Sequence, residues 1–156
     1  MQIMAEKREE KEQSGRLTLR KGERLHHRTL VEGLFAKGKT LYDFPLRLTW
    51  RVITEEDLQE AFRHGVPEGI GGVQMLVTVP KKKRRRAVDR VLMRRRIREA
   101  YRLNRLPLKR LVESKPEIRS LQLAFIYLKD SNADYAEIER KMQGLIGKMM
   151  GKIGNF

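Results

Sequence analysis

The chain has 156 residues, 40% of them hydrophobic, and 35 Lys and Arg against 20 Asp and Glu give a formal net charge of +15. This length predicts one domain with a modest core. The charge predicts a polyanionic partner, and nucleic acid is favoured over an anionic membrane. The chain has no cysteine, which excludes disulfides and thiolate metal sites. No stretch has the length and apolarity of a signal peptide or a membrane span, so we expect a cytoplasmic protein without a membrane partner.

The first half of the chain predicts an extension, a helix and two strands. Residues 1–15 are polar and charged, which is typical of a disordered extension, and a single RNA-binding domain is expected over residues 16–153. Between residues 21 and 37, apolar residues recur at intervals of three and four residues, which predicts an amphipathic helix ended by Gly38. In the following segment, 44–52, every second residue is apolar and the residues between them are mostly basic or polar. This alternation predicts a strand with one basic face. Residues 53–72 are acidic and glycine-rich and predict a long connection, which could include one helical turn at Thr54.

The second half of the chain completes the fold. A second strand is predicted at residues 73–80, and a helix is predicted from the mid-80s to about Leu106, where Pro107 breaks it. The near-continuous apolar run 121–128 indicates a strand buried on both faces. A last helix is predicted over residues 134–153. The fold class is therefore α+β, a two-layer sandwich of a small mixed sheet with three helices, in the order helix, two or three strands, helix, strand, helix.

The most unusual feature is the stretch from residue 81 to 105, which reads KKKRRRAVDRVLMRRRIREAYRLNR and holds 13 of the 35 basic residues with only two acids. At 100° per residue, Met93, Ala100 and Tyr101 fall on one narrow apolar stripe with Ile97. The opposite side presents a row of arginines: Arg95, Arg98 and Arg102. A solvated helix usually mixes charge signs, whereas these side chains repel one another. Guanidinium groups fit phosphate oxygens, so the pattern favours phosphate binding.

The stretch VPKKKRRRAVDRVLMRRRIREAYRLNR resembles the signature region of the bacterial ribonuclease P protein subunit, in which a strand, a short basic loop and an arginine-rich helix follow one another. ERLHHRTLVEGLFAKGKT and FPLRLTW are similar to the family's first helix and the strand after it. The resemblance covers roughly residues 19–128, and the last helix more weakly. It departs from the family at Val91 and Leu92, where the family has Asn and Arg. Both positions project outward on the helix, so we expect them to face RNA. The alternative is that Val91 or Leu92 packs against the protein's own loop or first helix.

The resemblance implies the protein part of an endoribonuclease whose RNA subunit carries the active site, with Mg²⁺ at that site and none bound by the protein alone. Its partners would be the catalytic RNA and precursor tRNA, whose 5′ leader is removed, with no obligate protein partner. The residues expected to bind RNA are Lys81, Lys82, Arg90, Arg94, Arg95, Arg98 and Arg102. The residues expected to contact the precursor leader are Phe35, Lys39, Arg47 and Arg51. Core packing is an equal alternative for Phe35.

A nuclease acting alone needs clustered carboxylates or a histidine pair, and neither is evident. The sequence predicts no catalytic residue and no metal ligand in the protein. A plain structural RNA-binding protein, such as a ribosomal protein, is the alternative function. A DNA-binding basic helix is a further alternative, but it would need a dimerisation face that no heptad run supplies.

Overall fold

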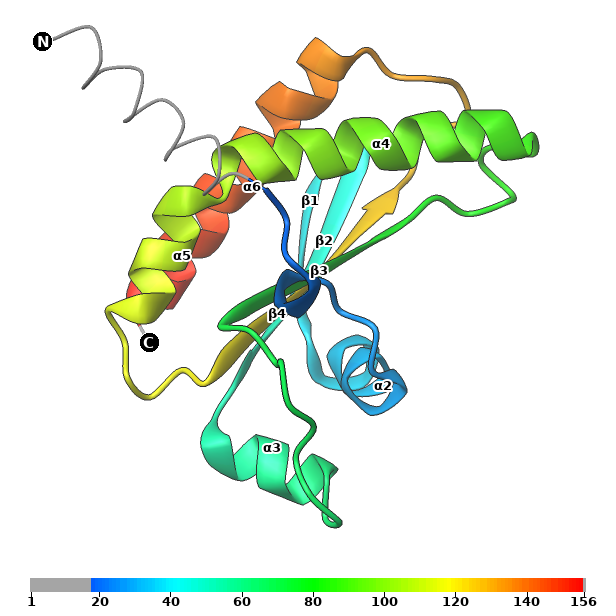
Figure 1. Cartoon of the computed structure of the whole chain (residues 1–156). Coiled ribbons are helices and arrows are strands. Elements are labelled where there is room, and N and C mark those ends of the chain that lie inside the picture. Colours follow the sequence, from blue (N-terminus) through cyan, green and yellow to red (C-terminus); the bar gives the residue numbers. More distant parts are fainter. Residues whose placement is uncertain (1–17, 156) are drawn as a thin grey trace, which may run out of the picture.

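The computed structural model describes residues 18–155, which form one four-stranded sheet with helices on both of its faces (Figure 1). The elements and their bounds are η1, a 3₁₀ turn (Lys21–Glu23), α2 (Arg28–Lys37), β1 (Lys39–Asp43), β2 (Leu46–Ile53), α3 (Glu55–Ala61), β3 (Val73–Thr78), α4 (Ala87–Asn104), α5 (Leu106–Glu113), β4 (Ser120–Tyr127) and α6 (Tyr135–Gly154). Within this range no helix is both long and apolar enough to cross a lipid bilayer.

The sheet has the strand order β1-β2-β4-β3. β1 pairs antiparallel with β2, β2 pairs antiparallel with β4, and β3 lies parallel to β4. The parallel pair is joined by a crossover that contains α4 and α5. All eight residues of β4 are buried, as its near-continuous apolar run predicts. The predicted α+β class and mixed sheet are confirmed, and the predicted elements occur in the predicted order, with α3 and α5 in addition to the three helices expected.

Two clusters of apolar side chains cover the two faces of the sheet. The larger one joins Leu48 and Phe125 to Ile97 of α4 and Met142 of α6. The smaller one joins α2 to the opposite face through Leu34, Ile53 and Ala124, among others. Figure 1 shows α4, α5 and α6 on one side of the sheet and α2 on the other. The alternation in β2 therefore separates two packed faces, and α2 covers only part of the second.

The first helix is shorter than predicted. The periodic residues from 21 to 37 predict one helix, but the α-helix begins at Arg28, and only η1 is helical before it. The intervening backbone is held elsewhere, because the Leu25 amide donates to the Met75 carbonyl of β3 at 2.9 Å and Arg24 forms a parallel bridge with Met75. Tertiary pairing has overridden the local helical pattern here. The C-terminal end at Gly38 is as predicted.

Three elements were not fully predicted. β1 forms a hairpin with β2, yet its residues are exposed or half-buried, and apolar and polar residues do not alternate along it. The helical turn expected at Thr54 is a seven-residue helix, α3, whose capping box joins Thr54 and Asp57 reciprocally. Pro107 does end α4, but the chain continues as α5, because proline is tolerated in the first turn of a helix.

A buried ion pair fixes the segment before α2 to the end of α4. The guanidinium of Arg105 is fully buried and its Nε lies 2.8 Å from Oε1 of Glu23, while Nζ of Lys109 lies 3.1 Å from the same oxygen. Burial opposes ionisation of Glu23, but hydrogen bonds from Arg105, the Arg20 backbone amide and Lys109 lower its pKa to about 2. Arg105 also donates to the Thr18 carbonyl at 3.1 Å. We call this contact the Glu23–Arg105 clamp.

The same segment covers the outer edge of β3. Besides the bridge at Met75, the side-chain amide of Gln74 donates to the Gly22 carbonyl at 2.9 Å. The backbones of Gly22 and Gly71 approach so closely that a Cβ on Gly71 would lie 2.5 Å from the Gly22 oxygen, so this crossing requires glycine. η1 is therefore attached to the sheet as well as to α4.

Candidate nucleic-acid interface

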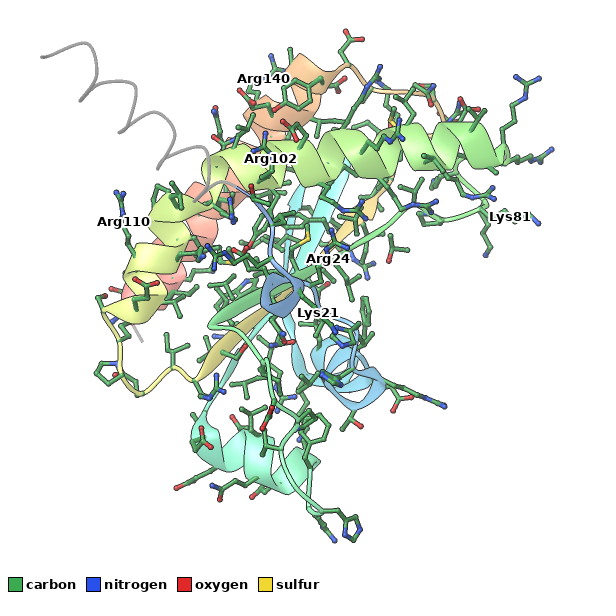
Figure 2. All side chains as sticks on the ribbon, in the orientation of Figure 1. Lys21, Arg24, Lys81, Arg102, Arg110 and Arg140 are labelled. Atoms are coloured by element: carbon green, nitrogen blue, oxygen red, sulfur yellow. The ribbon has the colours of Figure 1, made fainter. Side chains whose placement is uncertain are left out.

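α4 buries one side and presents arginines on the other. Met93, Ile97, Ala100 and Tyr101 are all buried in the larger core, which confirms the predicted apolar stripe. Basic side chains run along this helical layer, and Figure 2 labels Lys81 near one end, Arg102 in the middle and Arg110 on α5.

Several arginines of the basic stretch hold the protein itself together. Arg84 donates to the Asn132 side chain and the Asp130 carbonyl, both at 2.8 Å, and pairs with Asp89. Arg90 donates to the carbonyls of Arg84 and Arg85. These bonds order the loop before α4 against the segment between β4 and α6, so the basic loop is presented in a fixed shape.

Further along α4, two more arginines have partners within the protein. Arg96 donates to the Ala133 carbonyl at 2.6 Å, which ties the helix to the segment before α6. Arg102 forms two hydrogen bonds with Glu99, at 3.0 and 2.6 Å. Glu99 therefore offsets the charge of Arg102 at this end of the row.

The remaining basic residues form an open row. Lys81, Lys82, Arg95 and Arg98 are exposed and Arg94 is half-buried. Considering residues 18–155 alone, no hydrogen bond or ion pair engages these five side chains. The seven residues predicted to bind RNA thus divide into five that are open, one that orders the loop (Arg90) and one that is paired (Arg102).

A groove lies beside the middle of α4. It encloses about 670 Å³ and is lined by Thr18, Leu19, Arg24, Arg95, Arg96, Arg98, Glu99, Arg102 and Tyr135. Arg24 enters it from the segment that the Glu23–Arg105 clamp holds in place, and Figure 2 labels it beside η1. Sequence reasoning missed Arg24 because nothing near it in the sequence indicates that it meets α4.

The residues predicted to contact a leader do not all lie on one face. Phe35 is 46% exposed on α2, which excludes core packing as its role. Arg47 and Arg51 alternate with the core residues of β2 and so face the α2 side. Lys39 pairs with Trp50 in the β1–β2 register, and its Nζ lies 5.3 Å from the Trp50 ring centroid, on the opposite face. Arg47 and Arg51 therefore lie on the face of the sheet that α2 covers, and Lys39 lies on the other face.

Two exposed aromatic residues at the β1–β2 hairpin were missed. Tyr42 and Phe44 are 64% and 57% exposed, and Tyr42 is the register partner of Arg47. Tyr42 therefore lies on the same face of the sheet as Arg47, which is half-buried. The strand signal for β1 would have revealed Tyr42, but it is too weak to read from the sequence.

The comparisons with known proteins agree on one family. The model of the family described as Ribonuclease P matches residues 19–150. The ribonuclease P protein components of two Porphyromonas gingivalis strains are 32% and 33% identical over 135 residues, which cover 86% of this chain and 88% of each relative. The chain belongs to the ribonuclease P protein family.

Two solved structures share the fold of this ribonuclease P protein. The RNase P protein of Staphylococcus aureus superposes with a TM-score of 0.56 at 13% identity, covering 81% of this chain and 94% of that one. The RNase P protein from Thermotoga maritima gives 0.54 at 19% identity, covering 81% and 96%. The chain is thus the protein component of an endoribonuclease that processes the 5′ end of precursor tRNA together with an RNA subunit.

The departure from the family pattern has a different meaning at each of its two positions. Val91 is 41% exposed and projects outward as predicted. Leu92 is half-buried and packs against the larger core, so the prediction that it faces RNA is wrong. The helical projection placed Leu92 on the outer side, but the core that packs against α4 extends further around the helix than the predicted stripe. An arginine at Leu92 would have to leave this contact.

Among residues 18–155, no group of three or more His, Cys, Asp or Glu side chains comes together in a way that could hold a metal ion. His27 packs edge-on against Phe62, and burial, with the neighbouring His26, lowers its pKa.

Proposed function

We propose that the open row of α4 binds the catalytic RNA of ribonuclease P. The single observation that carries this proposal is that several guanidinium groups of α4 and two ammonium groups of the loop before it lack partners in the described part of the chain. A helix that is fixed at both ends presents them with little further loss of conformational entropy. The proposed RNA-binding residues are Lys81, Lys82, Arg90, Arg94, Arg95, Arg98 and Arg102.

In this proposal the RNA carries the active site, and Mg²⁺ bound there activates the attacking water. The protein supplies positive charge and a shaped surface, and a single RNA-binding domain over residues 16–153 is enough for both. No further protein subunit is required. The assembly works in the cytoplasm, where precursor tRNA is made.

We further propose that Phe35, Lys39, Arg47 and Arg51 contact the single-stranded leader of precursor tRNA. Phe35 offers an exposed ring on which a base can stack, and Tyr42 lies beside Arg47 on the same face of the sheet. Aromatic faces combined with basic side chains are typical of surfaces that bind single strands. The nearby cations would follow the leader backbone.

Equilibrium binding to the catalytic RNA tests the first proposal. Arg95→Ala combined with Arg98→Ala removes two charged contacts, each worth roughly 1.5 to 3 kcal/mol when well formed, so the affinity should fall by at least tenfold. Arg63→Ala is the matched control, because Arg63 is exposed beyond α3, far along the chain from α4. Equal affinities for the double variant and the control would contradict the proposal.

The assembled enzyme tests the leader contact. Phe35→Ala should weaken binding of precursor tRNA by about 1 to 3 kcal/mol if the ring stacks on a base. Mature tRNA lacks the leader and serves as the control ligand. A loss of the same size for both ligands would assign Phe35 another role.

A further inference from the structure

The C-terminal half of α6 contains glycines that the fold does not require. Four of the eleven residues from 144 to 154 are glycine, whereas residues 135–143 contain none. A Cβ added to Gly147, Gly151 or Gly154 would meet open space. Within α6, which lies entirely in the described range, no glycine has a positive φ. Packing and backbone conformation therefore do not explain glycine at these three positions.

These glycines weaken the end of the helix. Glycine loses more backbone entropy on folding than alanine does, so each glycine inside a helix favours the unfolded segment about fivefold over alanine. Gly147 and Gly151 together favour local unfolding about 25-fold. The helical state of residues 147–154 must therefore be stabilised by their packing on the rest of the domain.

The two halves of α6 are attached to the domain in different ways. In the first half, Nζ of Lys141 lies 3.1 Å from Oδ1 of Asp43 in β1, and the Gln143 amide donates to a side chain of α4 at 3.1 Å. Beyond residue 144, buried apolar side chains such as Ile153 hold the helix against the larger core. Figure 1 shows this end of α6 beside α5. The change from polar attachment to apolar packing therefore coincides with the glycines.

A buried hydrogen-bond donor lies beside the end of α6. Trp50 lines the same small cavity as Lys152 and Ile153 of α6. Its side chain is only 4% exposed, and its indole Nε1 has no acceptor among the described residues. A buried donor without a partner is costly, whereas a donor that meets water is satisfied. The unpaired indole therefore favours a state in which the end of α6 has moved away and water enters.

The charges around this cavity act in the same direction. Lys152 of α6 meets three further cations there, which are Lys37, Lys39 and Arg51, and none of the residues that line the cavity is acidic. Like charges gathered around a space of about 230 Å³ repel one another. Movement of Lys152 away from the sheet relieves part of this repulsion.

We propose that residues 147–154 of α6 form a hinged end, which opens and closes while the rest of the domain stays folded. Burial of Met149 and Ile153 holds it closed, and Lys115 donates to the Gly154 carbonyl at 3.4 Å. The glycines, the unpaired indole and the surplus positive charge all lower the free energy of opening. Because the polar contacts of the first half of α6 lie before the hinge, opening leaves α4 and its arginines in place.

The hinged end gives one corner of the sheet two arrangements. In the closed arrangement Trp50 and the apolar side of the last turns are covered. In the open arrangement they reach water, and Lys152 moves with the helix end. Salt screens the repulsion that favours opening, so ionic strength shifts the balance towards the closed arrangement.

Hydrogen exchange of the full-length protein, followed by NMR, tests the hinge. The decisive amides are those of residues 148–150, because ordinary fraying is confined to the last turn of a helix. We expect them to exchange at least about a hundredfold faster than the amides of residues 138–143, after correction for intrinsic rates. Gly147→Ala with Gly151→Ala should slow their exchange about 25-fold. Ala136→Gly, an exposed change in the first half of α6, is the matched control and should leave it unchanged.

The indole proton of Trp50 reports the same opening, because the chain has a single tryptophan. It should exchange with the protection of residues 148–150, and raising potassium chloride should slow both. Lys152→Gln should also slow both, about threefold, relative to Lys148→Gln. Lys148 is exposed one turn earlier and does not line the cavity.

Three results would each overturn the proposal. The first is protection of residues 148–150 equal to that of residues 138–143, since α6 would then open as one unit. The second is exchange that the double alanine variant does not slow. The third is an indole proton as protected as the amides of β4, since Trp50 would then stay covered until the whole domain unfolds.

Discussion

The middle and the C-terminal end of α4 use the same residue type for opposite purposes. In the middle, Arg95 and Arg98 are exposed and have no partner in the described part of the chain. One turn beyond Arg102, the guanidinium of Arg105 is fully buried against Glu23. The difference teaches that an arginine-rich stretch is not one functional unit. Burial and the nearest carboxylate decide whether each arginine stabilises the fold or remains available for RNA.

The largest effect on stability should come from breaking the Glu23–Arg105 clamp. Arg105→Ala leaves a buried carboxylate without its main partner, which typically costs about 3 to 5 kcal/mol of unfolding free energy. Urea denaturation measures the loss. Arg110→Ala, an exposed change on α5, should cost less than about 0.5 kcal/mol. Similar values for the two variants would show that the clamp does not differ from a surface arginine.

Acid should remove the stability that Glu23 contributes. The pKa of Glu23 is lowered from 4.5 to about 2 in the folded protein. Its contribution is therefore complete above pH 4.5 and is lost as the pH falls towards 2. By linkage the loss is on the order of 3 kcal/mol. Glu23→Gln should flatten the dependence of the unfolding free energy on pH in this range, and an unchanged slope would contradict the role of the clamp.

The fold and the open row could largely be predicted from the sequence, because both depend on local periodicity. The 3.6-residue period placed Met93 and Ile97 in the core and Arg95 and Arg98 outside, and the apolar run of β4 indicated burial on both faces. The clamp could not be predicted, because Glu23 and Arg105 are 82 residues apart. The division of Lys39 from Arg51 depends on the β1–β2 register, and β1 has too weak a pattern to be recognised.

A smaller effect should distinguish Leu92 from Val91. Leu92→Arg forces a charge into a side of α4 that packs on the core, and it should lower the unfolding free energy by about 1 to 3 kcal/mol. Val91→Asn changes an exposed position and should cost less than about 0.5 kcal/mol. Thermal unfolding compares the two variants, and equal melting temperatures would place both residues outside the core.

The smallest effect on stability should come from the open row. Arg95→Ala with Arg98→Ala removes two mutually repelling charges and should change the unfolding free energy by less than about 0.5 kcal/mol. The same variant should reduce the slope of log affinity for RNA against log salt concentration by about 1.4 to 1.8, since each phosphate contact contributes 0.7 to 0.9. A large loss of stability with an unchanged slope would move these arginines to the structural group.

Residues 22–25 cover the outer edge of β3, and this affects how the protein behaves before it binds RNA. An uncovered strand at a sheet edge is a template for pairing with another chain, and such pairing leads to aggregation. The bridge between Arg24 and Met75, with the bond from Gln74 to Gly22, occupies that edge. The other edge belongs to β1, which is five residues long and begins with a lysine, and both features discourage strand addition. Neither edge of the sheet is therefore a long, uncovered template to which a second copy of the chain could add a strand.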